Sequence, residues 1–152
     1  MRGFEVYKDC SLIVSDLCKS LGLSSWIPRR ETPKSAGYDL RSIEDIDIQP
    51  GQVALIGTGL TAYMLDDEEL QIRCRSGIAK KGIILANGVG TVDADYYGNH
   101  IKVMLKNTTS EVFHIATGDR IAQAVFSKYL TVDQDDPAKK ERSGGFGSTG
   151  LK

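Results

Sequence analysis

Short apolar segments recur along residues 36–126, and Gly, Asp and Asn separate them. Runs of this length between frequent turn residues are typical of antiparallel β-proteins. The pattern predicts strands over Ile46–Ile48, Gln52–Gly57, Leu60–Tyr63, Leu70–Cys74, Ile83–Leu85, Ile101–Leu105, Val112–Ile115 and Ile121–Lys128, with turns at Pro50–Gly51 and Asp66–Asp67. Because long helical patterns are scarce between them, we expect an all-β fold, an antiparallel β-sandwich of jelly-roll type.

The two ends of the chain depart from this pattern. Ser15 and Asp16 predict the cap of a short helix that carries Leu17, Cys18 and Leu21 and ends at Gly22. We expect residues 1–26 to form an N-terminal extension, part helical and packed on a domain that spans residues 27–130. Residues 131–142 are polar and charged, which favours a tether, and residues 131–152 as a whole are expected to be this tether and a flexible, glycine-rich C-terminal arm.

Length and composition narrow the class of protein. The chain has 152 residues, of which 41% are hydrophobic and 26% charged, and this suits one globular domain. Its formal net charge of −1 gives no general attraction to a nucleic-acid backbone, so we expect no direct nucleic-acid binding. Any phosphate binding must then come from local arginines and backbone N–H groups.

Cysteine usage and hydropathy indicate the compartment. Cys10, Cys18 and Cys74 are odd in number and form no CxxC pair, which argues against a disulfide framework and a structural zinc site. The N-terminus has no apolar signal core, and no stretch approaches the roughly 20 apolar residues of a membrane span. We expect a cytoplasmic protein, or one of the host cytoplasm if the chain is viral, without membrane association.

Residues 144–150 (GGFGSTG) cannot build a core but suit a nucleotide. Glycine lets backbone N–H groups approach an anion, and the hydroxyls of Ser148 and Thr149 can donate to phosphate oxygens. Phe146 offers a flat surface for a nucleobase, and Arg142 supplies a cation. A disordered tail is the alternative. The single Phe among glycines favours an arm that orders on a nucleotide.

Arg75, Ser76 and Gly77 follow a predicted strand and combine a fixed cation, a hydroxyl donor and a backbone that a ligand can approach. The same tripeptide is also common in ordinary loops. Cys74 is expected to be a small strand residue, because no His neighbours it in sequence to activate a thiolate.

Residues 87–98 (NGVGTVDADYYG) are the densest candidate segment in the body of the chain. The β-rich flanks predict a hairpin whose glycines open space. Asp93 can orient or deprotonate a water, Asn87 can donate and accept toward a base edge, and Tyr96 can pack against a sugar. An Asp-rich hairpin that caps its own backbone is the alternative.

Two further segments carry weaker signals. Residues 118–123 (GDRIAQ) form a turn that runs into a strand, where Asp119 and Arg120 are expected to make a surface ion pair and Gln123 is less ordinary. Residues 35–40 (SAGYDL) place the carboxylate of Asp39 at a strand entry. His100 and His114 have no ligand-like spacing, so each is expected to be solvated or packed.

In this order, the five segments resemble the five motifs of the trimeric dUTP pyrophosphatase (dUTPase) family, from about Ile27 to Gly150. The resemblance implies a dUTPase-like β-clip subunit of jelly-roll type in a homotrimer with shared active sites at subunit contacts. It also implies hydrolysis of dUTP to dUMP and pyrophosphate, with Mg²⁺ held mainly by the substrate phosphates. This reaction keeps uracil out of DNA and supplies dUMP for dTMP synthesis.

The same resemblance implies roles for matching residues. Asp93 would hold the water that attacks the α-phosphorus, Tyr96 would lie under the deoxyribose, and Asp39 would help hold hydrated Mg²⁺. The implied substrate contacts are Arg75, Ser76, Gly77, Asn87, Gly90, Thr91, Val92, Tyr96, Ile101, Gln123, Arg142, Phe146, Gly147, Ser148 and Thr149. Of these, Asn87 and main-chain groups near Gly90 and Ile101 would read the uracil, and Phe146 would stack on it.

Some positions depart from the family pattern. The spacing from Arg142 to Phe146 is one residue shorter than the common Arg-Gly-x-Gly-Gly-Phe, so the register of Arg142 is open. Cys74 stands where proline is common, and Val92 replaces a frequent isoleucine. The resemblance assigns no role to residues 1–26.

Two alternatives remain from the sequence. A dCTP deaminase shares this fold but needs a glutamate on the strand after the hairpin, where residues 100–104 read HIKVM. A nucleotide-responsive binding or regulatory protein would keep the site and use the N-terminal extension or a surface loop to hold a protein partner, whose identity the sequence does not give.

Overall fold

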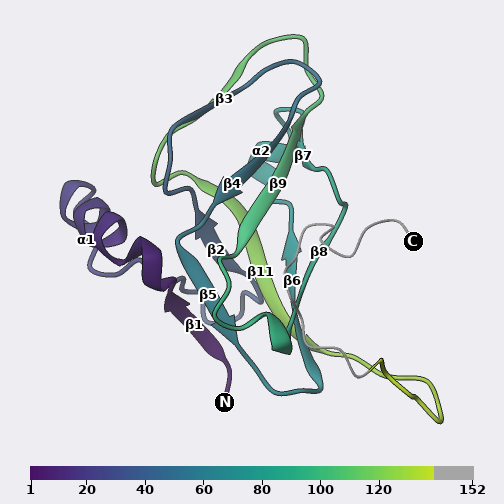
Figure 1. Ribbon diagram of the computed structural model, residues 1–152. Helices are drawn as coiled ribbons and strands as arrows, with labels where there is room; N and C mark the ends of the chain where they lie inside the picture. Colours follow the sequence, from purple (N-terminus) through teal and green to yellow (C-terminus); the bar gives the residue numbers. More distant parts are fainter. Residues whose placement is uncertain (139–152) are drawn as a thin grey trace.

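The structure, a computed structural model, describes residues 1–138 (Figure 1). Its strands are β1 (Gly3–Val6), β2 (Tyr38–Arg41), β3 (Ile46–Ile48), β4 (Val53–Gly57), β5 (Leu60–Tyr63), β6 (Glu68–Arg73), β7 (Ile83–Leu85), β8 (Gly90–Asp93), β9 (Lys102–Asn107), β10 (Phe113–Ile115) and β11 (Arg120–Lys128). Its helical segments are η1 (Lys8–Cys10), α1 (Ser11–Ser20), α2 (Ser76–Ala79) and η2 (Ala94–Tyr96).

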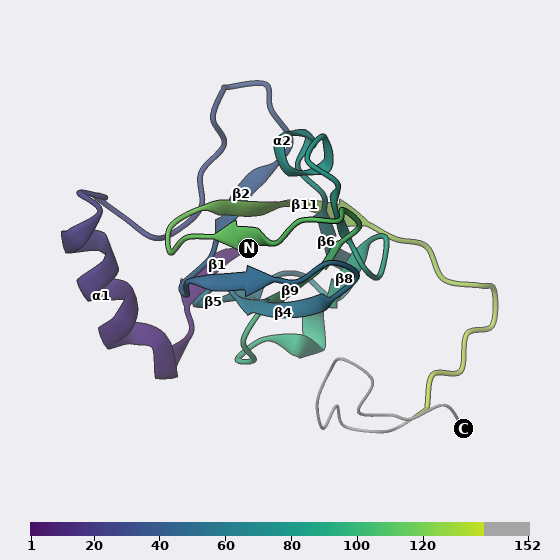
Figure 2. The ribbon, with the colours of Figure 1, turned by 90° about the horizontal axis from the view of Figure 1, so that it is seen from above.

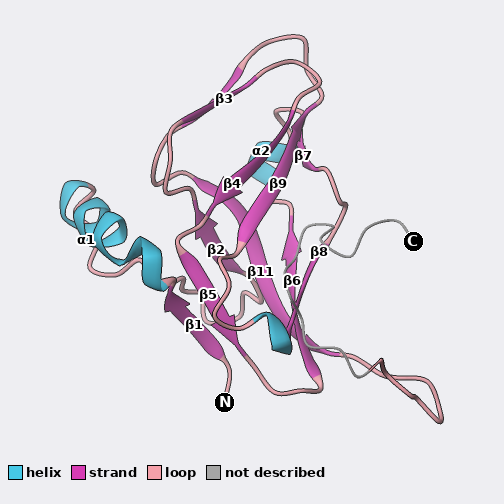
Figure 3. Ribbon diagram, in the orientation of Figure 1, coloured by secondary structure: helices cyan, strands magenta, loops and turns pink. Residues whose placement is uncertain are grey.

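Within the described residues, every strand pairing is antiparallel. Figure 3 shows that more of the chain is in strands than in helices. One sheet has the order β2-β11-β6-β8 and a second the order β4-β9-β7, while β1 pairs with β5 and β3 with β10. Seen from above, β2, β11 and β6 form one layer, and β1, β5, β9 and β4 form the layer below it (Figure 2). The expected all-β, jelly-roll-like fold is confirmed.

The core lies between these two layers and is almost wholly aliphatic. Alternating strand positions supply it, as the period of two requires. Its most deeply buried side chains are Leu40, Ile48, Ile56, Leu60, Leu70, Ile83, Ile101, Val103, Leu105, Ile115 and Ile121. Burial of this apolar surface is the main stabilising contribution, and it fixes strand register because a one-residue slip would turn the apolar face outward.

The predicted strands correspond to strands of the structure, and Ile46–Ile48, Leu60–Tyr63 and Ile83–Leu85 agree at both ends. The turns at Pro50–Gly51 and Asp66–Asp67 are also present. Strand β1 was not predicted, because it lies outside residues 36–126, where the recurring apolar segments indicate strands.

The predicted helix exists, but its start was placed wrongly. It begins at Ser11 instead of after Ser15. The η1 turn ends at Cys10 and continues directly into the helix, which has no side-chain cap. The helix end agrees with the prediction, because Gly22 has φ +65° and its N–H donates to the carbonyl of Lys19. The N–H of Leu23 bonds back to Cys18, which completes a Schellman ending.

The two ends of the segment 1–26 are built into the sheet framework, while α1 between them is largely exposed. Strand β1 pairs with β5 along its whole length, and Trp26 is buried with its Nε1 donating to the carbonyl of Thr58 at 2.8 Å. In Figure 1, α1 (purple) stands to one side of the sandwich while β1 lies along β5. Among residues 1–138, no helix has the length and apolar character needed to cross a membrane.

The start of the chain is also held by an ion pair with β6. Both guanidinium nitrogens Nε and Nη2 of Arg2 donate to the carboxylate of Glu68, whose side chain is only 2% exposed. The hydrogen bond from Arg2 is the largest cause that lowers the pKa of Glu68, from 4.5 to about 2, and the N–H of Leu65 also donates to this carboxylate. The charged form of Glu68 therefore stabilises the fold.

We expect Arg2→Met to lower the thermal midpoint at pH 7, because it leaves the Glu68 carboxylate buried without its cation. Since folding lowers the pKa of Glu68, its contribution is complete above pH 4.5 and is lost as the pH falls toward about 2. The difference in midpoint between the two proteins should therefore shrink over this interval in calorimetric scans.

Lys19→Ala is the matched control, because it removes an ion pair with Asp16 in which both side chains are more than 70% exposed. It should leave the midpoint unchanged at every pH. An Arg2→Met protein as stable as the parent at pH 7 would contradict the role given to this ion pair.

Candidate active site

A cleft of about 410 Å³ opens where the loop before β2, the loop after β6 and strand β11 meet. Three of the segments singled out in the sequence, residues 35–40, 75–77 and 118–123, supply most of its walls. It is lined by Glu31, Ser35, Ala36, Gly37, Asp39, Arg73, Arg75, Ser76, Gly77, Gln123 and Val125. The predicted phosphate contacts of the body of the chain thus lie together, beside Asp39.

The carboxylate of Asp39 holds two arginines at this cleft. Its Oδ1 accepts from Nε of Arg75 at 2.8 Å, and its Oδ2 accepts from Nη1 of Arg120 at 3.1 Å. Arg75 also donates through Nη1 to the carbonyl of Arg120, at 3.2 Å. Because the side chains of Asp39 and Arg75 are only 15% and 25% exposed, these charge-assisted bonds fix the guanidinium in place.

The surface ion pair expected between Asp119 and Arg120 is wrong. Asp119 belongs to the turn, where its Oδ2 accepts from the N–H of Ala116, whereas Arg120 begins β11 and pairs with Asp39 and with Glu31. Arg120 is thus the residue of this segment that sequence reasoning undervalued. Its partners are 81 and 89 positions away, so no local pattern reveals them.

Gln123 closes the contact between the three walls of the cleft. Its Nε2 donates to the carbonyl of Cys74 at 3.1 Å, directly before Arg75. Its Oε1 lies so close to Gly37 that a methyl group at this position would overlap it. A side chain at position 37 would therefore have to displace the amide of Gln123, which joins β11 to the end of β6 and packs against the loop before β2.

Asp93 lies at the other end of β6. Strand β8 runs antiparallel to β6, with Asp93 opposite Glu69 and Gly90 opposite Ile72. Residues 69–75 span about 20 Å, because a strand advances ~3.3 Å per residue. Asp93 lines a separate pocket of about 620 Å³ together with Asp66, Glu69, Ala94, Asp95 and Tyr129. The single chain therefore does not bring Asp93 to Arg75.

The hairpin expected over residues 87–98 is only partly present. Its flanks pair, because β7 and β9 are neighbours with Leu85 opposite Leu105, but the segment itself crosses to the other sheet, where β8 pairs with β6. Glycine permits this path, since Gly88 has φ +71° and a Cβ on Gly90 would lie 3.1 Å from the Cβ of Ile72. The sequence could not show it, because the pattern does not encode which sheet a short strand joins.

Loop 96–101 follows β8 and is held by hydrogen bonds. The hydroxyl of Tyr96 donates to the carbonyl of His100 at 3.1 Å. The N–H of Ile101 donates to Leu60 at 2.8 Å, and its carbonyl accepts from Oγ1 of Thr58 at 2.6 Å. The N–H and the carbonyl of Ile101 thus both make hydrogen bonds within the subunit. Recognition of the uracil by main-chain groups near Ile101 stays a prediction.

The remaining predicted contacts have different surroundings. Asn87 and Thr91 are exposed, and Val92 is half-buried. Arg142, Phe146, Gly147, Ser148 and Thr149 lie outside the described residues. Glu31 and Arg73, which line the cleft, were not predicted, and neither stands in a segment with a chemical signature.

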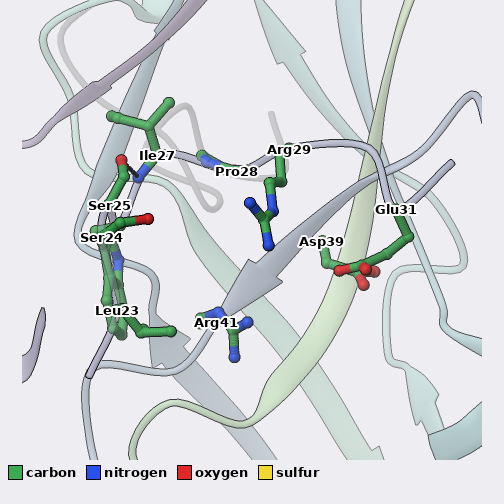
Figure 4. Close-up of a pocket in the computed structure, with 10 residues that line it drawn as sticks. Leu23, Ser24, Ser25, Ile27, Pro28, Arg29, Glu31, Asp39 and Arg41 are labelled. Atoms are coloured by element: carbon green, nitrogen blue, oxygen red, sulfur yellow. Dashed lines mark hydrogen bonds between the residues drawn. The ribbon is translucent and has the colours of Figure 1, made fainter. Parts of the chain in front are cut away.

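A small cavity of about 90 Å³ lies beside the cleft and shares Glu31 and Asp39 with it. Its other walls come from residues 23–29 and from Arg41 of β2. Figure 4 shows the side chain of Arg29 directed toward Arg41, with Asp39 and Glu31 at one end. Arg41 is anchored by its bond to the carbonyl of Gly118 at 2.7 Å. The segment after α1 thus packs close behind the cleft.

Together, these observations define a jelly-roll protein with an arginine-lined cleft. The family model described as dUTPase matches residues 24–150 of the chain. The deoxyuridine 5'-triphosphate nucleotidohydrolase of Lactococcus lactis is 42% identical over 157 residues, which cover 99% of this chain and 98% of that protein. The protein of the same name from Nautilia profundicola is 46% identical over 137 residues, which cover 87% of this chain and 96% of that protein.

Solved structures agree with these sequence matches. The dUTPase of Streptococcus mutans has a TM-score of 0.73 and 36% identity, and covers 86% of this chain and 98% of its own. A mutant dUTPase from phage phi11 of S. aureus, described with a structural Mg(II) ion, has a TM-score of 0.71 and shares the fold at 18% identity, covering 93% and 99% of the two chains. The chain belongs to the dUTPase family.

We expect Gly37→Ala to displace Gln123 and break its bond to Cys74, at a cost of about 1 kcal/mol in the free energy of unfolding. Chemical denaturation measures this value. Gly77→Ala is the control in the same cleft, because nothing lies within 4 Å of the added methyl group. Equal unfolding free energies for the two variants would show that the approach of Gln123 to residue 37 is not tight.

Proposed function

We propose that this chain hydrolyses dUTP to dUMP and pyrophosphate, which keeps uracil out of DNA and supplies dUMP for dTMP synthesis. The observation that carries this proposal is the cleft in which Asp39 fixes Arg75 and Arg120 beside Ser76 and Gln123. Cations and donors held in place before the substrate arrives complement a triphosphate and its developing charge. We take the nucleotide to be dUTP because the chain belongs to the dUTPase family.

In the proposed reaction, a water attacks the α-phosphorus while the bond from this phosphorus to the bridging oxygen breaks. Pyrophosphate leaves with the bonding electron pair, and the carboxylate of Asp93 orients the water and takes its proton. Arg75, Ser76, Gly77 and Gln123 bind the phosphate oxygens. Arg75 suits this role because Asp39 holds its guanidinium rigid and its charge is permanent.

The nucleoside is assigned to residues 87–101. Asn87 and main-chain groups near Gly90 and Ile101 read the uracil, with Thr91 and Val92 beside them, and Tyr96 lies against the deoxyribose where a 2′-hydroxyl would not fit. Of the arm residues, Phe146 stacks on the uracil, Arg142, Ser148 and Thr149 close on the γ-phosphate, and Gly147 is a further substrate contact. Closure of such an arm excludes bulk water.

The donor set fits Mg²⁺ held mainly by the substrate. No group of three or more His, Cys, Asp or Glu side chains within residues 1–138 is arranged as a metal site. Both oxygens of Asp39 already accept hydrogen bonds from arginines, which leaves Asp39 suited to bonding a metal-bound water. When bound, the ion would supply charge neutralisation on the phosphates.

The separation of Asp93 from Arg75 supports a homotrimer with shared active sites. Carboxylates surround Asp93 at one end of β6, and arginines line the cleft at the other end. If the acidic end of one copy meets the arginine-lined end of the next, the interface is head-to-tail, and such an interface closes into a ring when the rotation between copies returns to the first copy. Each ring contact then assembles one complete site.

The outer face of the β4-β9-β7 sheet also favours association. Val53, Leu55 and Ile84 are exposed there, and the pairing of Lys106 with both Val53 and Ile84 places them on one face. Lys106 lies between Val53 and Ile84 on this face, so the exposed apolar side chains are interrupted by one charge. Exposed large apolar side chains gathered on one sheet face favour contact with a neighbouring copy.

The activity is tested with a substrate panel. With Mg²⁺, the protein should release one pyrophosphate per dUMP from dUTP and act far more slowly on dTTP, dCTP and UTP. Equal rates on all four nucleotides would overturn the assignment. Release of ammonia from dCTP would identify a deaminase, and retention of dUTP without turnover would identify a binding protein.

Subunit complementation tests the shared site. Asp93→Asn and Arg75→Ala should each lose nearly all activity as pure proteins. When equal amounts are unfolded and refolded together, about one quarter of the contacts join an intact Asp93 to an intact Arg75 on the neighbour, so about one quarter of the parental activity should return.

The control for complementation is each variant refolded alone, which must stay inactive. An inactive mixture, with mixed trimers demonstrated by mass spectrometry of differently tagged copies, would place both residues in one chain's site. The substrate panel on the parental protein separates this outcome from a failure of the activity itself.

A further inference from the structure

Residues 1–26 lie largely outside the part of the chain that the family model matches, which begins at residue 24. They nevertheless contact the surroundings of loop 96–101. Strand β5 is the link, because it pairs with β1 and also contacts η2, which ends at Tyr96. In Figure 3, β5 lies between β1 and the short η2 helix.

An aromatic contact joins Tyr7 to His100. The two rings stack with centroids 4.9 Å apart and an interplanar angle of 9°. The backbone of Tyr7 is itself fixed, because its N–H donates to the carbonyl of Gly59 at 2.8 Å. Tyr7 therefore presents a held surface to His100.

His100 also contacts Tyr96, through its main-chain carbonyl. Its Nε2 accepts from the N–H of Gly59 at 2.9 Å, which requires a neutral ring with its proton on Nδ1. Burial, then Lys102, lowers the pKa of His100, while Glu44 opposes this shift. The carbonyl of the same residue accepts the hydroxyl of Tyr96. The ring and the main chain of His100 thus connect Tyr7 to Tyr96.

Two more bonds support the same region. The hydroxyl of Tyr97 donates to Oε2 of Glu5 at 2.9 Å, which ties β1 directly to the residue after Tyr96. Trp26 donates to the carbonyl of Thr58, whose N–H and Oγ1 both donate to the carbonyl of Ile101. The N-terminal residues are therefore connected to loop 96–101 at three positions: His100, Tyr97 and, through Thr58, Ile101.

We propose that the N-terminal segment, through Tyr7, is a positioning element that holds Tyr96 against the sugar and so sets the discrimination between deoxyribonucleotides and ribonucleotides. This inference rests on the proposed function of Tyr96. Tyr7 stacks on the residue that holds the Tyr96 hydroxyl, so its effect is on where that ring lies. A fixed ring excludes a 2′-hydroxyl by overlap, whereas a ring that can shift makes room for it.

The test compares Tyr7→Leu with Tyr7→Phe. Leucine removes the stacking on His100, and phenylalanine keeps it. We expect Tyr7→Leu to lower the ratio of kcat/KM for dUTP to kcat/KM for UTP by about three- to tenfold, the range that an aromatic contact is worth. Most of the change should be a gain in UTP turnover. Tyr7→Phe should keep the parental ratio.

Phe4→Leu is the control for mere destabilisation of the segment. Phe4 lies on β1, in the same N-terminal segment as Tyr7, but it packs against Tyr38 and Phe126, with ring centroids 5.5 Å and 5.2 Å away. It should lower the thermal midpoint without changing the dUTP to UTP ratio. Hydrogen exchange of the amides in residues 96–101 should speed up in Tyr7→Leu and stay parental in Phe4→Leu.

The outcomes are distinct. If the parental protein does not hydrolyse dUTP, the proposed function fails. If it does, but Tyr7→Leu keeps the parental ratio and exchange pattern, the positioning role is wrong. Equal losses of the ratio in Tyr7→Leu and Phe4→Leu would also overturn it, because the effect would then be one of general stability.

Discussion

The nearly extended backbone of β6 imposes the constraint on which the rest of the site depends. It lies inside its sheet between β11 and β8, so its length cannot adapt to a ligand. Asp93 stands opposite its first half, at Glu69, and Arg75 lies just beyond its other end, after Arg73 and Cys74. Chemistry that needs both groups at one phosphorus atom cannot be done by one copy. The proposed reaction would then require oligomeric assembly, for which the acidic and arginine-lined ends would be complementary surfaces.

At the arginine-lined end, the carboxylate of Asp39 fixes the position of Arg75 before any substrate binds. An arginine side chain that is mobile in solvent loses conformational entropy when it binds a substrate. Arg75 is already held by Asp39 and by the carbonyl of Arg120. The cost of ordering it is met when the protein folds. The side chain of Gln123 is also held before substrate binds, since its Nε2 donates to the carbonyl of Cys74 and its Oε1 packs against Gly37. The cleft is thus rigid where phosphate charge is expected.

The sequence predicted what local pattern encodes. Alternation located strands such as Ile83–Leu85, and the glycine at position 22 located the end of α1. It did not predict that β8 joins β6, because a four-residue strand carries no information about its partner. It also did not predict the bond from Arg120 to Asp39, which joins residues 81 positions apart. The failed cap at Ser15 has a different cause, since the η1 turn already leads the chain into the helix.

The N-terminal segment shows how one strand serves both stability and specificity. Within the described residues, β5 has β1 as its ladder partner, so removal of β1 would expose the edge of a strand whose Leu60 and Ala62 are buried. The same stretch, from Thr58 to Leu60, bonds the main chain of Ile101 and the ring of His100. A change at Tyr7 therefore acts on Tyr96 through His100, over a path of direct contacts. Arg2, bonded to Glu68 on β6, holds the far end of this segment by charge, so the segment is fixed at both ends by different interactions.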